Sequence, residues 1–109
     1  MIELSNAMVA LHRECFGRGP GAARSFVNED MAVCVLTDIY TPVERTLIEA
    51  GHADHVRRTR SLYSDACEGK HLQRAEQILG RPVTAFLSVV NVNPDVAIEV
   101  FLLGETDAG

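Results

Sequence analysis

Residues 17–21, Gly-Arg-Gly-Pro-Gly, form the loop in this 109-residue sequence with the clearest potential for binding chemistry. Converging backbone N–H groups beside an arginine can hold an anion. The sequence lacks the Gly-Lys-Ser/Thr of a P-loop, and no strand precedes the loop as a dinucleotide-binding fingerprint requires. A plain turn between a helix and a strand explains the same residues, so both interpretations stay open.

Four carboxylates are candidates for acid–base chemistry. Asp38 follows an apolar run, at a junction between a strand and a helix. Glu44 fits a helix-capping role, and Asp95 fits a turn after a proline. Glu99 lies in the middle of an apolar run and has no such explanation, so we expect it to pair with an arginine.

Three arginines, Arg57, Arg58 and Arg60, fall within four residues of a predicted helix and point in several directions. They predict a solvated polar face, with a patch for phosphate, lipid headgroups or an acidic protein as the alternative. His52 and His55 share one helical face, but no further motif fixes a third ligand beside them. His12 and His71 are distant in sequence, and we predict no metal site.

Nucleophilic catalysis has little support in the sequence. Ser61, Ser64 and Ser88 lack a glycine-flanked turn, and Cys34 lies in an apolar strand where a thiolate is disfavoured. We therefore predict a protein that is not an enzyme and that carries no cofactor.

The composition is that of one soluble globular domain over residues 1–109, with 47% hydrophobic and 23% charged residues. The formal net charge of -5 argues against nucleic-acid binding. No apolar run approaches the roughly 20 residues that cross a bilayer, so no membrane insertion is expected. No signal peptide is evident, and three widely spaced cysteines predict reduced thiols in the cytoplasm.

Apolar periodicity and capping signals place the predicted helices at 2–16, 42–50, 54–67 and 71–79. The first helix has an apolar stripe of Leu4, Met8, Leu11 and Cys15. Thr41, with Pro42 and Glu44, forms a capping box for the second. Gly69 is expected to separate the last two.

Predicted strands at 24–27 and 31–36, and at 83–89 and 96–103, form two hairpins. The order α-β-β-α-α-α-β-β predicts an α+β fold of two layers, a four-stranded antiparallel sheet with helices on one face. The strands at 31–36 and 96–103 are apolar on both faces, which predicts central positions. Too few helices remain to cover the second face, so we predict a homodimer.

Three sets of motifs resemble one known family. They are Phe16-Gly17-Arg18-Gly19-Pro20 with Ala23-Arg24; Asp38 with Thr41-Pro42-x-Glu44-Arg45; and Gly80-Arg81-x-Val83 with Pro94-Asp95. Together they resemble the MpsC-like small-domain family, which is linked to sodium-translocating membrane-potential-generating systems. The resemblance covers nearly the whole chain. Val89-Val90 depart from the polar pair that the family often carries after Ser88.

The resemblance implies a cytoplasmic, non-catalytic accessory protein of a membrane ion (sodium) or inorganic-carbon transport system, with transporter subunits as partners. The alternative is a regulatory module that binds a small anion or a nucleotide at residues 17–21. The predicted anion- or partner-binding residues are Gly17, Arg18, Gly19, Pro20, Arg24, Asp38, Arg45 and Arg57.

Overall fold

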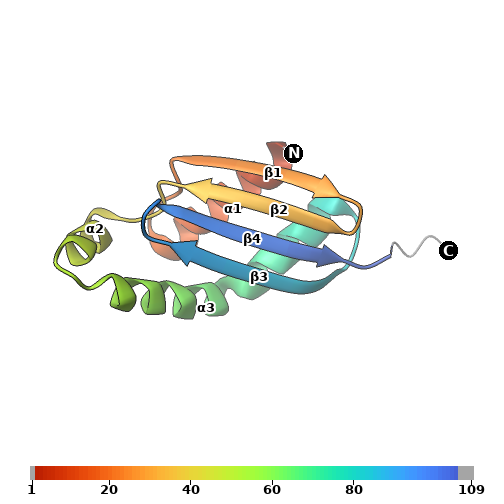
Figure 1. Cartoon of the computed structure of the whole chain (residues 1–109). Helices are drawn as coiled ribbons and strands as arrows, with labels where there is room; N and C mark the ends of the chain where they lie inside the picture. Colours follow the sequence, from red (N-terminus) through yellow and green to blue (C-terminus); the bar gives the residue numbers. More distant parts are fainter. Residues whose placement is uncertain (1, 106–109) are drawn as a thin grey trace.

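The computed structural model describes residues 2–105, which form three helices and one four-stranded antiparallel sheet (Figure 1). The elements in chain order are α1 (Ile2–Phe16), β1 (Ala22–Asn28), β2 (Met31–Thr37), α2 (Pro42–Glu49), α3 (Ala53–Leu79), β3 (Val83–Asn91) and β4 (Val96–Leu103). Helix α1 and the C-terminal half of α3 lie on one face of the sheet, behind it in Figure 1. The predicted two-layer α+β fold is confirmed.

The strand order is β1-β2-β4-β3, so each predicted hairpin supplies one edge strand and one central strand. β2 and β4 meet at the centre, as their apolar character on both faces predicts. Their register places Cys34 opposite Glu99, and Ser88 of β3 lies on the other side of Glu99. A mid-strand carboxylate is thereby fixed at the centre of the sheet.

The predicted break at Gly69 is wrong, because α3 runs without interruption from Ala53 to Leu79. Glycine inside a helix costs only about 1 kcal/mol relative to alanine. Val56 and Ala75 of α3 are buried on either side of it, and this packing outweighs that cost. The helix ends at Gly80, which takes the left-handed conformation (φ 67°) that glycine favours.

Helix α2 begins with the predicted capping box. The Thr41 hydroxyl accepts from the Glu44 backbone N–H at 3.2 Å, and the Glu44 carboxylate accepts from the Thr41 N–H at 2.8 Å. Pro42 occupies the first turn, where no N–H is needed. With the start of α3, this helix lies beyond one end of the sheet (Figure 1).

The core lies between the sheet and the helices. The stripe of α1 supplies Leu4, Met8 and Leu11, all buried as predicted. Phe101 and Leu36 meet them from the sheet, and both are fully buried. Every second residue of β2 and β4 faces this core, which leaves the alternate residues on the other side.

The opposite side of the sheet, which we call the open face, is apolar and is not covered by any helix of residues 2–105 (Figure 1). The open face includes Phe26, Met31, Val33, Val35, Leu87, Val89, Ile98, Val100 and Leu102. Leu87 and Val89 on the edge strand β3 are 59% and 63% exposed. Arg24 is the charged residue at its β1 edge.

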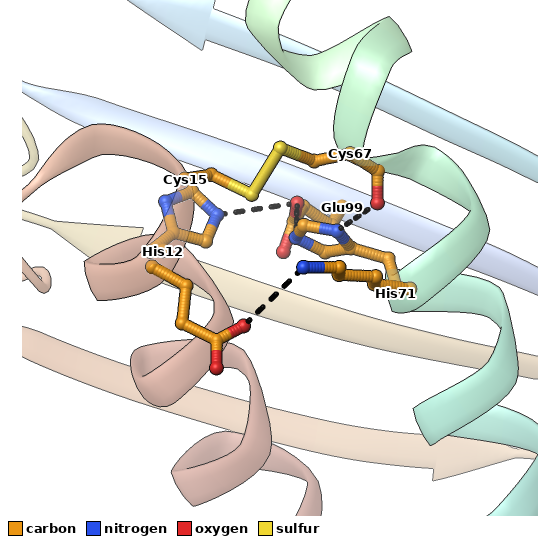
Figure 2. Close-up of a disulfide and its surroundings, with 7 residues drawn as sticks. His12, Cys15, Cys67, His71 and Glu99 are labelled. Carbon is orange, nitrogen blue, oxygen red and sulfur yellow. Dashed lines mark hydrogen bonds and ion pairs between the residues drawn. A yellow bond between two sulfur atoms is a disulfide. The ribbon is translucent and has the colours of Figure 1, made fainter.

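The cysteines depart from the prediction of three reduced thiols. Cys15 of α1 and Cys67 of α3 form a disulfide across 52 residues (Figure 2). Both residues lie on the helical layer, and the length of α3 brings Cys67 over the end of α1. Cys34 is free and buried, as expected. Burial, reinforced by the charge of Glu99, raises the pKa of this thiol to about 12.

Candidate functional site

The motif residues converge on one ionic cluster, made of Arg18, Asp38, Arg45 and Asp95. Arg18 Nη2 lies 2.8 Å from Asp38 Oδ2, and its Nη1 donates to the Asp38 carbonyl at 2.6 Å. Arg45 Nη2 pairs with the other oxygen of Asp38 and lies 3.2 Å from Asp95 Oδ2. Two cations and two carboxylates thus balance one another where β2 leads into α2.

The backbone around Asp38 explains why the loop before β1 contains glycine. Asp38 has a positive φ of 56°, which turns the chain sharply after β2. The Gly21 N–H donates to the carbonyls of Thr37 and Asp38 at 2.9 and 3.1 Å. A Cβ at Gly21 would come within 2.5 Å of Asp38 Oδ2, so a larger residue would displace the carboxylate.

Asp95 joins the turn between β3 and β4 to the same cluster. Its Oδ1 accepts the Ile39 N–H at 2.8 Å, so it fixes the backbone after Asp38. The Tyr40 hydroxyl donates to the Asn91 carbonyl at 2.8 Å from the same region. Burial, followed by the charge of Asp95, raises the pKa of Tyr40. The cluster therefore ties three loops together.

A second ion pair, between Glu44 and Arg60, lies beside the cluster. The predicted solvated position of Arg60 is wrong, because this residue is 2% exposed. Its guanidinium sits 4.1 Å from the centre of the Phe16 ring and donates to both oxygens of Glu44. Burial alone would raise the pKa of Glu44, but hydrogen bonds from Arg60 and Thr41 outweigh it and lower the pKa.

The predicted binding residues divide into two groups. Arg18, Asp38 and Arg45 come together, and the loop of Gly17, Gly19 and Pro20 carries Arg18 to them. Arg24 lies apart on β1, and Arg57 pairs with Asp54 on the exposed side of α3.

Two of the loop's four backbone N–H donors are engaged within the chain. The Gly17 N–H donates to Arg13 O, the Gly21 N–H donates within the junction, and Pro20 has no N–H. A Cβ at Gly19 would come within 3.3 Å of Val9, so the loop packs closely on α1. This geometry favours a structural role for residues 17–21, and anion binding there stays a prediction.

The sequence reasoning missed a third cluster, made of His12, His71 and Glu99. The predicted pairing of Glu99 with an arginine is wrong. Its carboxylate lies 3.3 Å from His12 Nε2 and 3.5 Å from His71 Nε2. All three residues are at least 95% buried. The signal in the sequence was Glu99 itself, a charged residue in the middle of an apolar strand. Because its side chain faces the core, its partners must come from the helical layer.

One known protein family matches nearly the whole chain. The family described as "Na+-translocating membrane potential-generating system (MpsC)" matches residues 2–105. The chain belongs to the MpsC family. The match spans all seven elements of the fold and the loops that carry the Arg18–Asp38–Arg45–Asp95 cluster. Neither the curated proteins nor the solved structures contain a match.

The MpsC family description connects this chain with a sodium-translocating system of a membrane. Within residues 2–105, none of the three helices combines the length and the apolar composition that a membrane crossing needs. The longest, α3, is strongly polar along most of its 27 residues.

Proposed function

We propose that this MpsC-family chain is a non-catalytic accessory protein of a sodium-translocating membrane system, and that it works as a homodimer. The family match supports the link to the membrane system. The homodimer is inferred from the open face, an apolar sheet surface that includes Met31 beside the side chains of β1, β3 and β4. Contiguous apolar surfaces of this kind mark protein contacts.

The arrangement of charges supports a non-catalytic role. Arg18, Asp38, Arg45 and Asp95 bond to one another and to backbone groups, which leaves no polar set directed at a substrate. Four hollows on the surface of residues 2–105 do not include any of these four side chains in their walls. These residues therefore act as connectors between loops.

A second copy of the chain is the occupant that the open face fits best. Stacked sheets pack about 10 Å apart through apolar side chains, and two open faces supply these from both sides. Arg24 lies at the edge, so two faces can meet centrally without burying a charge. Four strands about 4.8 Å apart present roughly 500 Å² per protomer, and two such faces reach the roughly 1,000 Å² of a specific interface.

The dimer can be tested by measuring molar mass in solution. Sedimentation equilibrium of the full chain should give twice the chain mass of 11.9 kDa. Leu87→Glu with Val89→Glu should give the monomer, because both side chains would place charge in the interface. Leu62→Glu is the matched control, since Leu62 is an exposed leucine (65%) on α3, away from the sheet. A monomeric wild type, or a dimeric double variant, would contradict this interface.

The accessory role needs a separate test. The tagged chain should retain proteins of the sodium-translocating system from detergent-solubilised membranes of its source cells. Loss of the chain should lower the sodium-dependent membrane potential, and added protein should restore it. Retention of no membrane protein, together with an unchanged potential, would overturn the role.

A cytoplasmic location is part of the same proposal. The Cys15–Cys67 disulfide is more typical of oxidising compartments, so the redox state of this pair is the informative measurement. Alkylation of thiols in freshly lysed cells should trap both cysteines as reduced thiols if the chain resides in the cytoplasm. A fully oxidised pair would argue for an oxidising compartment.

A further inference from the structure

The histidine–glutamate cluster brings three chain-distant residues together inside the molecule (Figure 2). His12 comes from α1, His71 from α3 and Glu99 from the central strand β4. They are 5%, 2% and 1% exposed. One ligand atom from each lies within 4.8 Å of the other two. No motif discussed above accounts for this cluster.

The cluster contains a buried carboxylate without a permanent positive partner. Within residues 2–105, the ion-pair contacts of Glu99 are with the two imidazoles alone. Glu99 Oε1 and His71 Nε2 are the buried side-chain atoms in that range that lack a hydrogen-bond partner. Burying a carboxylate without a full positive charge beside it is very costly, so a positive species should accompany it.

The hydrogen bond of His71 to the backbone determines which of its ring nitrogens faces Glu99. Its Nδ1 lies 3.0 Å from the carbonyl oxygen of Cys67. A carbonyl only accepts hydrogen bonds, so Nδ1 carries the proton and donates. In a neutral ring, Nε2 then turns a bare lone pair toward the Glu99 carboxylate 3.5 Å away. Two acceptors face each other across a gap that a cation would fill.

We propose that His12 Nε2, His71 Nε2 and the Glu99 carboxylate bind one divalent transition-metal ion, with Zn²⁺ the best fit. Two ligand atoms each about 2.0–2.1 Å from zinc, at a tetrahedral angle, lie roughly 3.4 Å apart. The distances of Glu99 Oε2 from His12 Nε2, 3.3 Å, and from His71 Nε2, 3.5 Å, agree with this spacing. The Cys67 carbonyl supplies the outer hydrogen bond that orients a metal-binding histidine.

The donor atoms also select the class of ion. Imidazole nitrogens suit zinc and its neighbours, whereas Mg²⁺ and Ca²⁺ prefer oxygen ligands throughout. Sodium is likewise a hard cation, so this cluster is not a binding site for a translocated Na⁺ ion.

The space around the cluster points to a structural ion. The cavity beside it measures about 10 Å³, which is room for roughly one water and not for an organic substrate. Ser64 and Ser88 line this cavity and also the open cleft between α3 and β3. That cleft gives an ion a route inward, and the bound ion would hold α1 and α3 against β4.

The disulfide adjoins the cluster and fixes the two helices that supply its histidines (Figure 2). Cys15 follows His12 by three residues, and Cys67 precedes His71 by four, about one helical turn in each case. The bond between them therefore limits how far the two imidazoles can separate. When the disulfide is formed, this restraint pre-organises the ligands before any ion arrives.

Cobalt titration of the wild-type chain tests the proposal directly. The protein is first freed of metal with a chelator, then titrated with Co²⁺ and followed by its visible d–d bands. We expect intense bands typical of tetrahedral cobalt, saturating at one ion per chain, and their loss on adding Zn²⁺. Excess Zn²⁺ at about 100 times Kd should raise Tm by on the order of 10 °C.

Variants then locate the ion. Glu99→Gln and His71→Gln should each weaken Zn²⁺ binding by more than about 100-fold, the upper range for loss of an outer-shell partner alone. The double variant His52→Gln, His55→Gln is the matched control, because it removes two exposed histidines outside the cluster. It should bind as the wild type does.

Two results would overturn the proposal, and neither depends on a variant folding. The first is the absence of tetrahedral cobalt bands from the folded wild type. The second comes from ¹⁵N NMR of the histidine rings. If both His71 nitrogens carry protons and Zn²⁺ leaves their signals unchanged, a proton holds the place assigned to the metal.

Discussion

Arg60 donates from Nε and Nη2 to the two carboxylate oxygens of Glu44, at 2.7 and 2.6 Å, while the same carboxylate caps helix α2. One acidic side chain thus fixes the start of α2 and neutralises a guanidinium buried between Phe16 and Tyr40. The capping motif evident in the sequence therefore has a second role, which is to connect α2 to α3.

Removing the Glu44 charge should destabilise the fold strongly. Glu44→Gln leaves the Arg60 guanidinium buried without a counter-charge, and breaking such a pair costs about 3 kcal/mol or more. Urea denaturation should show this loss in the free energy of unfolding. Arg57→Gln, which breaks an exposed ion pair on the same helix, should change it by less than about 0.5 kcal/mol. Equal effects of the two substitutions would contradict the buried pair's importance.

The same ion pair predicts a loss of stability in acid. The pKa of Glu44 is lower in the folded chain than its ordinary value of 4.5. The unfolded chain therefore takes up the proton first, and the contribution of Glu44 is complete above pH 4.5. It is lost as the pH falls below that value and through the folded pKa. The difference in unfolding free energy between wild type and Glu44→Gln should shrink over this range; a difference independent of pH would refute the assignment.

Two alanine substitutions at glycine should have opposite signs. Gly21→Ala drives a Cβ into the Asp38 side chain and should cost about 1–3 kcal/mol. Gly69→Ala meets open space within the continuous helix α3 and should stabilise by about 0.5–1 kcal/mol. Thermal unfolding of both variants checks this. A destabilising Gly69→Ala would indicate that α3 bends at that residue.

The Cys34 thiol should be inert in the folded protein. Its pKa of about 12 leaves almost no thiolate at pH 8, and its side chain is buried. In purified, oxidised protein with the Cys15–Cys67 disulfide formed, a disulfide-exchange reagent should therefore titrate one thiol per chain, and only after denaturation. Above pH 9.0 the unfolded thiol ionises while the folded one stays protonated, so stability should fall as the pH rises. Three reactive thiols in denaturant would instead show that Cys15 and Cys67 are reduced.

The parts of the fold that depend on local signals could be predicted from the sequence. The capping box at Thr41 and the stop at Gly80 act within a few residues, and each lies where the chemistry requires. The alternation along β2 and β4 also revealed a second apolar face. Gly69 misled the prediction because a glycine's local cost is small compared with the packing of a long helix.

The sites depend on distant pairs, which a single sequence does not reveal. His12 and Glu99 are 87 residues apart, and Cys15 and Cys67 are 52 apart. Only the crossing of α1 and α3 over β4 brings them together. Arg18, Asp38 and Arg45 could be predicted as site residues by their motifs, but the positive φ at Asp38 and the ion pairs among the three residues could not.

The uninterrupted course of α3 has a mechanical consequence. Its 27 residues span about 40 Å, well beyond the length of the strands it crosses. Its N-terminal end carries α2 outside the sheet, while Cys67 near its middle and His71 in its second half hold it to α1 and the core. A helix of this kind transmits force along its axis instead of absorbing it. A pull on α2 would therefore reach the segment around Cys67 and His71, where α3 is held against α1 and the sheet.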